Sequence, residues 1–452
     1  IIAIEKVVDS TGKITGDKTT DLSQFWWPWL QNPCLVTEDG CGRQSTSSIN
    51  FGMFGQGVMS VGGDISVEAG RHIKDLSVSL PTTWRKQGDS LLSYGGGDLQ
   101  LTAGGNLFSG SYFVGKGEGD IRVGGLMTAD ISDAAFNRTA TLLAVQDGKL
   151  NVVANSYMEI GGIYNPSWLF DGFDSQSYSA SSAVKLLSVT SSLLLGNMNA
   201  TPGSAYGVTD DSDSVLSGGY SFVLPAHLQL DALQGAITLR KNAELYPSAD
   251  GQLSLIADKD ITLINADVNN SYLGLIDTAA SALPSPFAPV RRQSETSFIK
   301  RNDKTSAFDW HSPDALHRYD SEPLRIYSLN GSLINGFAAR NYNGAMIVAA
   351  PKAADIRTGL DIVNLSFMGQ NLYDSDLTSI SAGRDLYNTP LVANLSVPFI
   401  ELGGGGTLAV SAGRNIGPLT SANEALTQNY LPAKNPSYPG IRTVGNSNNA
   451  YL

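Results

Sequence analysis

The fold is decided by the stretch Gly97–Leu107, which reads GDLQLTAGGNL. Leu99 and Leu101 alternate with polar residues, and every second side chain of an extended chain points to the same face. The stretch therefore predicts a short, half-buried strand. Ala103 and Gly104 then supply a small residue and a residue free to adopt φ > 0, which predicts a sharp corner before a second inward-facing strand.

The same pattern returns along the chain. One copy begins at Gly63, and a later copy has Leu408 and Val410 as its alternating apolar residues and Ala412 and Gly413 at its corner. Strands joined by tight corners at irregular spacing are typical of a parallel β-solenoid, in which each coil buries its apolar row against the next coil. A β-propeller is the main alternative, but its blades are longer and carry a recurring aromatic signature. We therefore expect an all-β chain of stacked parallel coils.

The irregular spacing predicts a division into coils and insertions. We expect coils over 57–165, 229–280 and 323–418, an insertion with β-rich loops over 166–228, and a loop insertion over 281–322. Irregular segments are expected at 1–56, which holds aromatic residues and both cysteines, and at 419–452, a tail or a link to further coils. Insertions of this kind lie on the outside of a solenoid, where binding functions are commonly found.

Composition and charge exclude several classes of function. The chain has 48 glycines, 42% hydrophobic residues and only 16% charged residues, which is typical of a folded protein with many turns. Its net charge of −12, without any cluster of Lys and Arg, predicts no nucleic-acid partner. No apolar run reaches the ~18 residues that suggest a membrane-spanning helix.

Two groups near the beginning of the chain are candidates for special roles. Cys34 and Cys41 fit a local disulfide in an oxidising compartment better than a zinc site, with free thiols as the alternative. Trp26, Trp27 and Trp29 surround a proline and could form a stacking platform for a sugar or an anchor against a partner. The alternative is that these tryptophans cover a flank of the solenoid.

Acidic residues suggest two further sites, and neither follows a specific motif. The segment 309–322 carries two of the four histidines among several carboxylates and could hold a metal ion. A solvated loop leading into the next coil is the preferred hypothesis for it. Asp120, Asp260, Asp361 and Asp385 could form a catalytic group of carboxylates, but the repeat explains some of them as turn residues. We therefore predict no catalytic residue, no metal site and no cofactor.

Three runs resemble the filamentous haemagglutinin family of bacterial outer-membrane and secreted proteins: Gly97–Leu107, Gly251–Ile261 (GQLSLIADKDI) and Pro323–Gly331 (PLRIYSLNG). The resemblance extends from about Gly57 to Ile416. It implies a right-handed parallel β-helix at the bacterial cell surface or secreted from the cell.

The same resemblance implies partners and a role. It implies export by a partner transporter in the outer membrane (two-partner secretion) and a role in adhesion, aggregation or biofilm. The partners would be receptors or glycans on host or bacterial surfaces, and self-association into fibres is a further option. Neither an amino-terminal secretion domain nor a carboxy-terminal toxin is recognised, so we expect an internal portion of the stalk. The alternatives are a polysaccharide-cleaving β-helix enzyme and the stalk of a contact-dependent toxin-delivery protein.

Overall fold

Strands and turns make up the part of the chain that the computed structural model describes, and this part contains no α-helix. Within it, no helix has the length and apolar character needed to cross a membrane. The described residues are 2–8, 14–21, 57–87, 90–130, 140–166, 178–196, 223–240, 243–265, 272–276, 315–337, 346–389, 398–419 and 440–443. The expectation of an all-β chain is confirmed for these residues.

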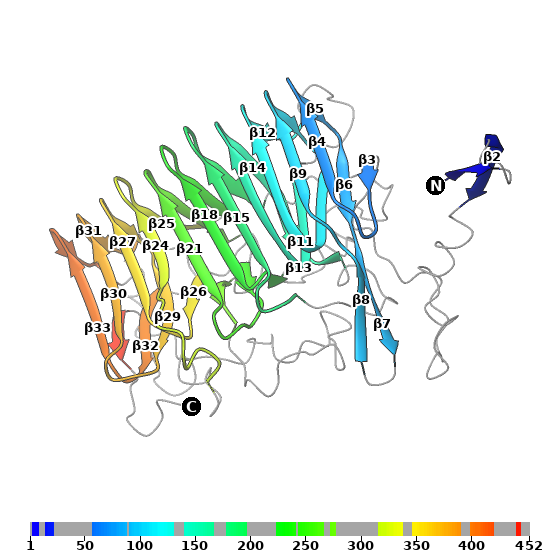
Figure 1. Cartoon of the computed structure of the whole chain (residues 1–452). Coiled ribbons are helices and arrows are strands. Elements are labelled where there is room, and N and C mark those ends of the chain that lie inside the picture. The colour runs from blue at the N-terminus through cyan, green and yellow to red at the C-terminus, as the bar shows by residue number, and fades with distance from the viewer. Residues whose placement is uncertain are drawn as a thin grey trace.

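The first face of the molecule is a ladder of eleven parallel strands (Figure 1). In order these are β4 (Ile65–Ala69), β9 (Leu99–Ala103), the end of β11 (Ser111–Val123), the end of β13 (Thr141–Ala154), β15 (Ala183–Ser188), β18 (His227–Ala232), β21 (Gln252–Ala257), β24 (Leu324–Ser328), β27 (Ala354–Thr358), β30 (Leu377–Ala382) and β33 (Thr407–Ala412). At the strand spacing of about 4.8 Å, eleven strands span about 50 Å.

Two further faces complete each coil. The second face stacks β5 (Ile73–Lys74), β10 (Leu107–Phe108), β12 (Met127–Thr128), β14 (Met158–Tyr164), β16 (Leu193–Leu195), β19 (Ile237–Arg240), β22 (Ile261–Asn265), β25 (Leu333–Phe337), β28 (Ile362–Val363), β31 (Asp385–Tyr387) and β34 (Asn415–Ile416). The third face stacks β3 (Gly57–Met59), β6 (Ser77–Leu80), parts of β11, β13 and β14, then β17 (Val223–Leu224), β20 (Ala243–Leu245), β23 (Tyr272–Leu275), β26 (Ile347–Ala350), β29 (Ser366–Asn371), β32 (Phe399–Gly404) and β35 (Gly440–Thr443). The chain visits the three faces in turn, as a β-solenoid requires.

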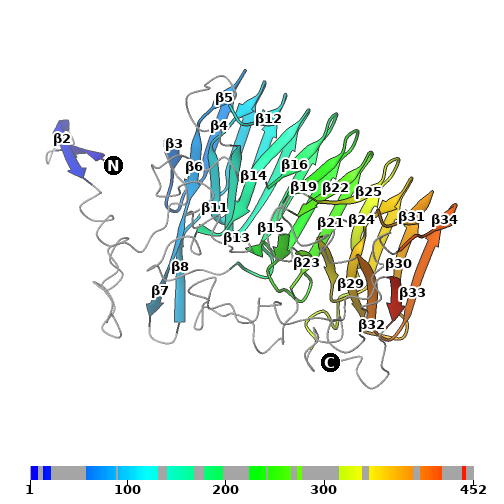
Figure 2. The same ribbon diagram turned by 180° about the vertical axis from the view of Figure 1, so that it is seen from behind.

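Two antiparallel hairpins depart from this order. β7 (Thr82–Gln87) and β8 (Ser90–Gly95) pair with each other between a third-face strand and a first-face strand, and Figure 2 shows this hairpin extending away from the stack. β1 (Ile2–Val8) and β2 (Ile14–Asp21) form a separate two-stranded sheet.

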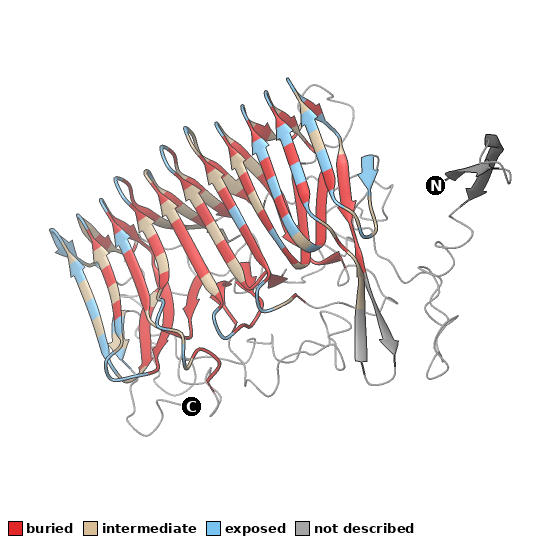
Figure 3. Ribbon diagram, viewed as in Figure 1, coloured by how far each residue is buried: buried red, intermediate tan, exposed pale blue. Residues whose placement is uncertain are grey.

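The core is a continuous column of apolar side chains, and its rows follow the strand register. One row places Leu101 against Ile121 on one side, and it continues through the stack until Ile380 lies against Val410. Leu101, Ile121 and Ile380 are each at most 1% exposed. Val410 is only partly buried, because β33 pairs with β30 on one side. Figure 3 shows the alternation of buried and more exposed residues along the strands.

The predicted repeat residues lie where the pattern placed them, but the role predicted for the corner glycines is wrong. Leu99, Leu101 and Ala103 are buried in β9, and Leu408 and Ala412 pack at the end of the same core. Gly104 and Gly413 are not among the residues with φ > 0, whereas Gly97 and Gly406 are, with φ of 140° and 74°.

The corner glycines are needed because neighbouring coils approach closely. A Cβ at Gly104 would lie 2.5 Å from the carbonyl oxygen of Gly70, and a Cβ at Gly413 would lie 2.2 Å from that of Gly383. No side chain fits at these distances, so the corner between the first and second faces requires the smallest residue. At the corner before the first face the same holds for Gly97, since a Cβ there would lie 2.6 Å from the carbonyl oxygen of Gly63.

The structure places coil strands inside some predicted insertions. β15 and β16 lie within 166–228, and each joins the stack through parallel pairing. The turn at Ala315–Asp320 lies within 281–322 and leads into β24. On the first face, paired residues of successive coils are therefore separated by as few as 20 residues, between β9 and β11, and by as many as 71, between β21 and β24.

Candidate functional site

Polar side chains at the corner between the first and second faces form a chain of hydrogen bonds, here called the corner ladder. It consists of Asp260, Ser332, Asp361, Asp385 and Asn415. The side-chain oxygen of each residue accepts a hydrogen bond from the backbone N–H of the next residue, at 2.8, 3.2, 3.1 and 3.1 Å in order. Each corner is thus joined to the corner of the following coil.

Arginines strengthen the corner ladder at two positions. Arg384 donates from Nε to Asp361 at 2.7 Å, and Arg414 donates to Asp385 at 3.3 Å. These hydrogen bonds from Arg384 and Arg414 lower the pKa of Asp361 and of Asp385 respectively. Both carboxylates are therefore held in their charged form by groups from the next coil.

Three of the four carboxylates considered for catalysis share one corner and make hydrogen bonds there, and the fourth lies apart from them. Asp260, Asp361 and Asp385 lie at one corner: Asp260 and Asp361 directly precede β22 and β28, and Asp385 is the first residue of β31. Their hydrogen bonds run to the next coil rather than within their own turn. Asp120 lies on the exposed side of β11 and is not part of this group.

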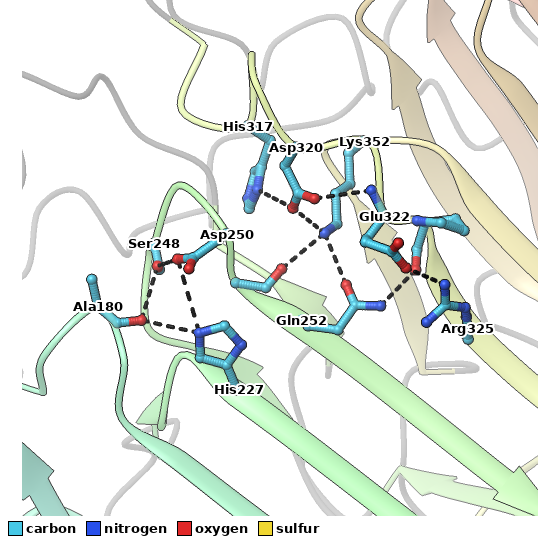
Figure 4. A network of polar contacts seen from close by, with 12 residues as sticks. Ala180, His227, Ser248, Asp250, Gln252, His317, Asp320, Glu322, Arg325 and Lys352 are labelled. Carbon is cyan, nitrogen blue, oxygen red and sulfur yellow. Dashed lines mark hydrogen bonds and ion pairs between the residues drawn. The ribbon is translucent and has the colours of Figure 1, made fainter. Parts of the chain in front are cut away.

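A second, buried group lies at the corner between the third and first faces (Figure 4). We call it the Lys352 cluster: Gly251, Gln252, His317, Asp320 and Lys352. Lys352 lies between β26 and β27, and its side chain is only 2% exposed. Its ammonium nitrogen lies 2.9 Å from the Gly251 carbonyl oxygen, 2.9 Å from Gln252 Oε1, and in contact with Asp320 Oδ2. The three donors of the ammonium group therefore have three acceptors.

The Lys352 cluster joins segments that are far apart in sequence. Gly251 and Gln252 begin the coil of β21, whereas Lys352 begins the coil of β27, and the coil of β24 lies between these two. Gln252 also donates to the carbonyl oxygen of Pro323 at 2.7 Å. The cluster therefore fastens the segment 315–323, which leads into β24, to the coils on either side of it.

Asp320 is the only carboxylate that contacts Lys352 in the described residues. Burial raises the pKa of Asp320, but the His317 ring, whose Nδ1 lies 3.6 Å away, and the hydrogen bond from Lys352 outweigh burial and lower this pKa to about 2. Asp320 also accepts a hydrogen bond from the backbone N–H of Glu322 at 3.0 Å. Burial lowers the pKa of Lys352, and the nearby carboxylates Asp320, Glu322 and Asp250 partly offset this.

His317 is enclosed beside this ion pair. Its side chain is 1% exposed, and its Nδ1 lies 3.6 Å from Asp320 Oδ2. Within the described residues, neither ring nitrogen has a partner at hydrogen-bond distance. The hypothesis of a solvated loop is therefore wrong for His317 and Asp320, because both side chains are packed against the start of β21 and against Lys352.

A neighbouring group contains Ser, His and Asp, the residue types of a hydrolytic triad, in a different arrangement. The Ser248 hydroxyl lies 3.0 Å from the Ala180 carbonyl oxygen and 2.7 Å from Asp250 Oδ1. His227 Nε2 lies 3.1 Å from the same carbonyl oxygen and 3.9 Å from Asp250 Oδ1. The Ser248 hydroxyl contacts a carbonyl and a carboxylate and does not contact the imidazole. This arrangement therefore does not activate the serine as a nucleophile.

Several candidate residues lie outside the described residues. These are Trp26, Trp27, Trp29, Cys34 and Cys41, together with positions 309–314 of the acidic and histidine-containing segment. Their disulfide, contact and metal-binding roles stay predictions. Among the residues that the structure does describe, no three His, Cys, Asp or Glu side chains gather in a way that could hold a metal ion.

Sequence reasoning missed Lys352 and Gln252. The available signal was a single lysine in the apolar run from Met346 to Ala354. A lysine in such a run is expected to be paired, because burial of an isolated charge is costly. Its acceptors could not be found from the sequence, since Gly251 and Gln252 lie 101 and 100 residues earlier in the chain and Asp320 lies 32 residues earlier.

Comparison with protein-family models, with curated proteins and with solved structures finds no match to this chain.

Proposed function

We propose that this chain is a stalk section of a large bacterial filamentous adhesin, exposed on the cell surface or secreted, and that its coils are right-handed. The observation that carries the proposal is the use of polar groups to join one coil to the next. The corner ladder uses its carboxylates for contacts along the axis, where they add to the continuous apolar core. Such a molecule provides length and stiffness.

The repeat supports the same proposal. A coil buries its apolar row only against its neighbours, so a solenoid extends along one axis without changing its cross-section. The resemblance of the repeats to those of filamentous haemagglutinin-like proteins fits a rod that holds other parts of a protein away from the cell. Segments that leave the stack are placed to contact a receptor or glycan, as loops on a rigid scaffold commonly do.

The parallel coil also fits export by an outer-membrane transporter. Each coil pairs with the coil before it, so a chain that emerges from a pore in an extended state can add coils one at a time. The nearest strands within a coil are joined by short corners, which keeps each folding step local.

Fractionation of the source cells tests the proposal. We expect an antibody against this chain to detect a band much larger than 47.8 kDa at the cell surface or in the culture medium. A band of 47.8 kDa confined to the cytoplasm would contradict a stalk. In that case the polysaccharide-cleaving alternative is tested by incubating the protein with acidic polysaccharides and following new reducing ends.

A further inference from the structure

Lys352 carries an amine in a closed site with one electrophile within reach. The side chains of Lys352 and Asp320 are 2% and 9% exposed, so a substrate from solution cannot reach the amine. The other two contacts of Nζ are the amide oxygens of Gly251 and Gln252, and the carbonyl carbon of an amide is a poor electrophile. The Asp320 carboxyl is the remaining group, and its Oδ2 contacts Nζ directly.

We propose that Lys352 and Asp320 form an intramolecular amide bond that cross-links two coils of the solenoid. A desolvated lysine is a recognised nucleophile in proteins, and fixed contact between two reacting groups replaces a bimolecular encounter. The three contacts of Nζ hold it against the carboxyl, and the enclosed site excludes the water that would otherwise stabilise the separate charges.

The reaction is a condensation that needs no oxidant or other reagent. The pair rests as ammonium and carboxylate, and one proton first passes from Nζ to the carboxylate. The neutral amine then attacks Cγ of Asp320, a C–N bond forms, and a C–O bond breaks. The second proton lost by the nitrogen leaves with the departing hydroxyl as one molecule of water. His317 Nδ1 lies 3.6 Å from Oδ2, on the oxygen side of this proton transfer.

The amide would connect the same two segments as the ion pair and would keep most of its hydrogen-bond partners. Its N–H keeps Gly251 O as an acceptor, and its carbonyl oxygen keeps the backbone N–H of Glu322 within reach. Two buried charges disappear, which removes the desolvation cost of the pair. The segment 315–323 and the corner before β27 would then be joined covalently.

Intact-mass measurement of the folded full chain tests the proposal. We expect a mass lower than that of the sequence by one water molecule, and a branched tryptic peptide that joins the segments around Lys352 and Asp320. The matched control is Lys352→Arg, which keeps the positive charge beside Asp320 but cannot form this amide. We expect this variant to have its full sequence mass.

A second source of water loss must be separated from the amide. Four Asp-Gly sequences, which begin at Asp39, Asp147, Asp171 and Asp250, allow the aspartate to dehydrate to a succinimide. Hydroxylamine cleaves the chain at a succinimide and leaves the side-chain amide intact. A folded protein that keeps its full sequence mass after prolonged incubation overturns the proposal. A water loss that persists in Lys352→Arg overturns it too, as does a water loss that disappears when hydroxylamine cleaves the chain. These outcomes do not depend on whether the chain is a stalk.

Discussion

The corner glycines allow a direct test of how the coils stack. Gly70 and Gly104 occupy the same position of the repeat on consecutive coils, after Ala69 and Ala103. A Cβ at Gly104 would lie 2.5 Å from the carbonyl oxygen of Gly70, whereas a Cβ at Gly70 would have no neighbour within 4 Å. Neither residue is among those with φ > 0. The Gly104→Ala and Gly70→Ala variants therefore differ in steric contact with the coil before them.

The expected magnitudes follow from this contact. In Gly104→Ala the two coils must separate by at least about 0.5 Å at the corner, and overpacking of this kind costs typically about 1–3 kcal/mol. The separation also lengthens the hydrogen bond from Gly104 N–H to Ala69 O, now 2.8 Å. In Gly70→Ala the loss of freedom in the unfolded chain should instead stabilise the protein by about 0.4–1 kcal/mol.

Hydrogen exchange of individual amides is the appropriate measurement, because a solenoid can unfold in segments. We expect Gly104→Ala to speed exchange in β9 and the adjoining part of β11, while Gly70→Ala leaves it unchanged or slower. Far-UV circular dichroism checks that both variants fold. Equal losses of protection in the two variants would refute the reasoning, since they would mean that the backbone conformation of the corner, and not the approach of the coils, requires glycine.

Three further predictions concern burial and charge. Lys352→Met should lower the free energy of unfolding by about 3–5 kcal/mol, because it leaves the Asp320 carboxylate buried without its ion-pair partner. Urea unfolding measures this, and the control is Lys149→Met, at a residue that is 50% exposed. In a chain that has its full sequence mass, and so a free Asp320 carboxylate, the pKa of Asp320 is lowered from 3.8 to about 2 on folding, so its contribution should be complete above about pH 4 and lost as the pH falls through about 2. Acid titration of that chain, followed by circular dichroism, checks this against Asp320→Asn, which should lack that part of the pH dependence. Identical acid profiles of the two uncross-linked proteins would contradict the assignment. Leu101→Ala should lower the free energy of unfolding by about 2–5 kcal/mol and Val410→Ala by clearly less, because Leu101 is 1% exposed and Val410 lies at the partly open end of the core. Comparable losses in thermal or urea unfolding would show that β33 is covered in solution.

The fold could be predicted from the sequence because its determinants are local. The alternation of Leu99 and Leu101 defines a strand, and the small residues that follow define a corner, so one copy of the repeat specifies most of a coil. The role of Gly104 was not predictable, because it depends on the distance to Gly70 in another coil. A sequence shows that glycine is present but not which atom lies opposite it.

The Lys352 cluster was beyond prediction for the same reason. Its members are separated by up to 101 residues, and their meeting depends on which coils become second neighbours. The segment length between coils varies too widely to be read from the spacing of the repeat. Asp361 and Asp385 were accessible, because the repeat itself marks their position, although their partners in the next coil were not.

The tight corner between the first and second faces helps to fix the position of each coil along the axis of the molecule. At this corner each coil turns within a few residues, as at Gly104–Asn106, whereas the longest stretches of sequence between consecutive strands fall at the other two corners. A longer connection at those corners therefore leaves the parallel pairing of the strands, and with it the axial pitch, unchanged. The height of any loop is set by the number of coils beneath it and not by the number of residues, so loops can be lengthened, shortened or replaced without moving the others along the axis.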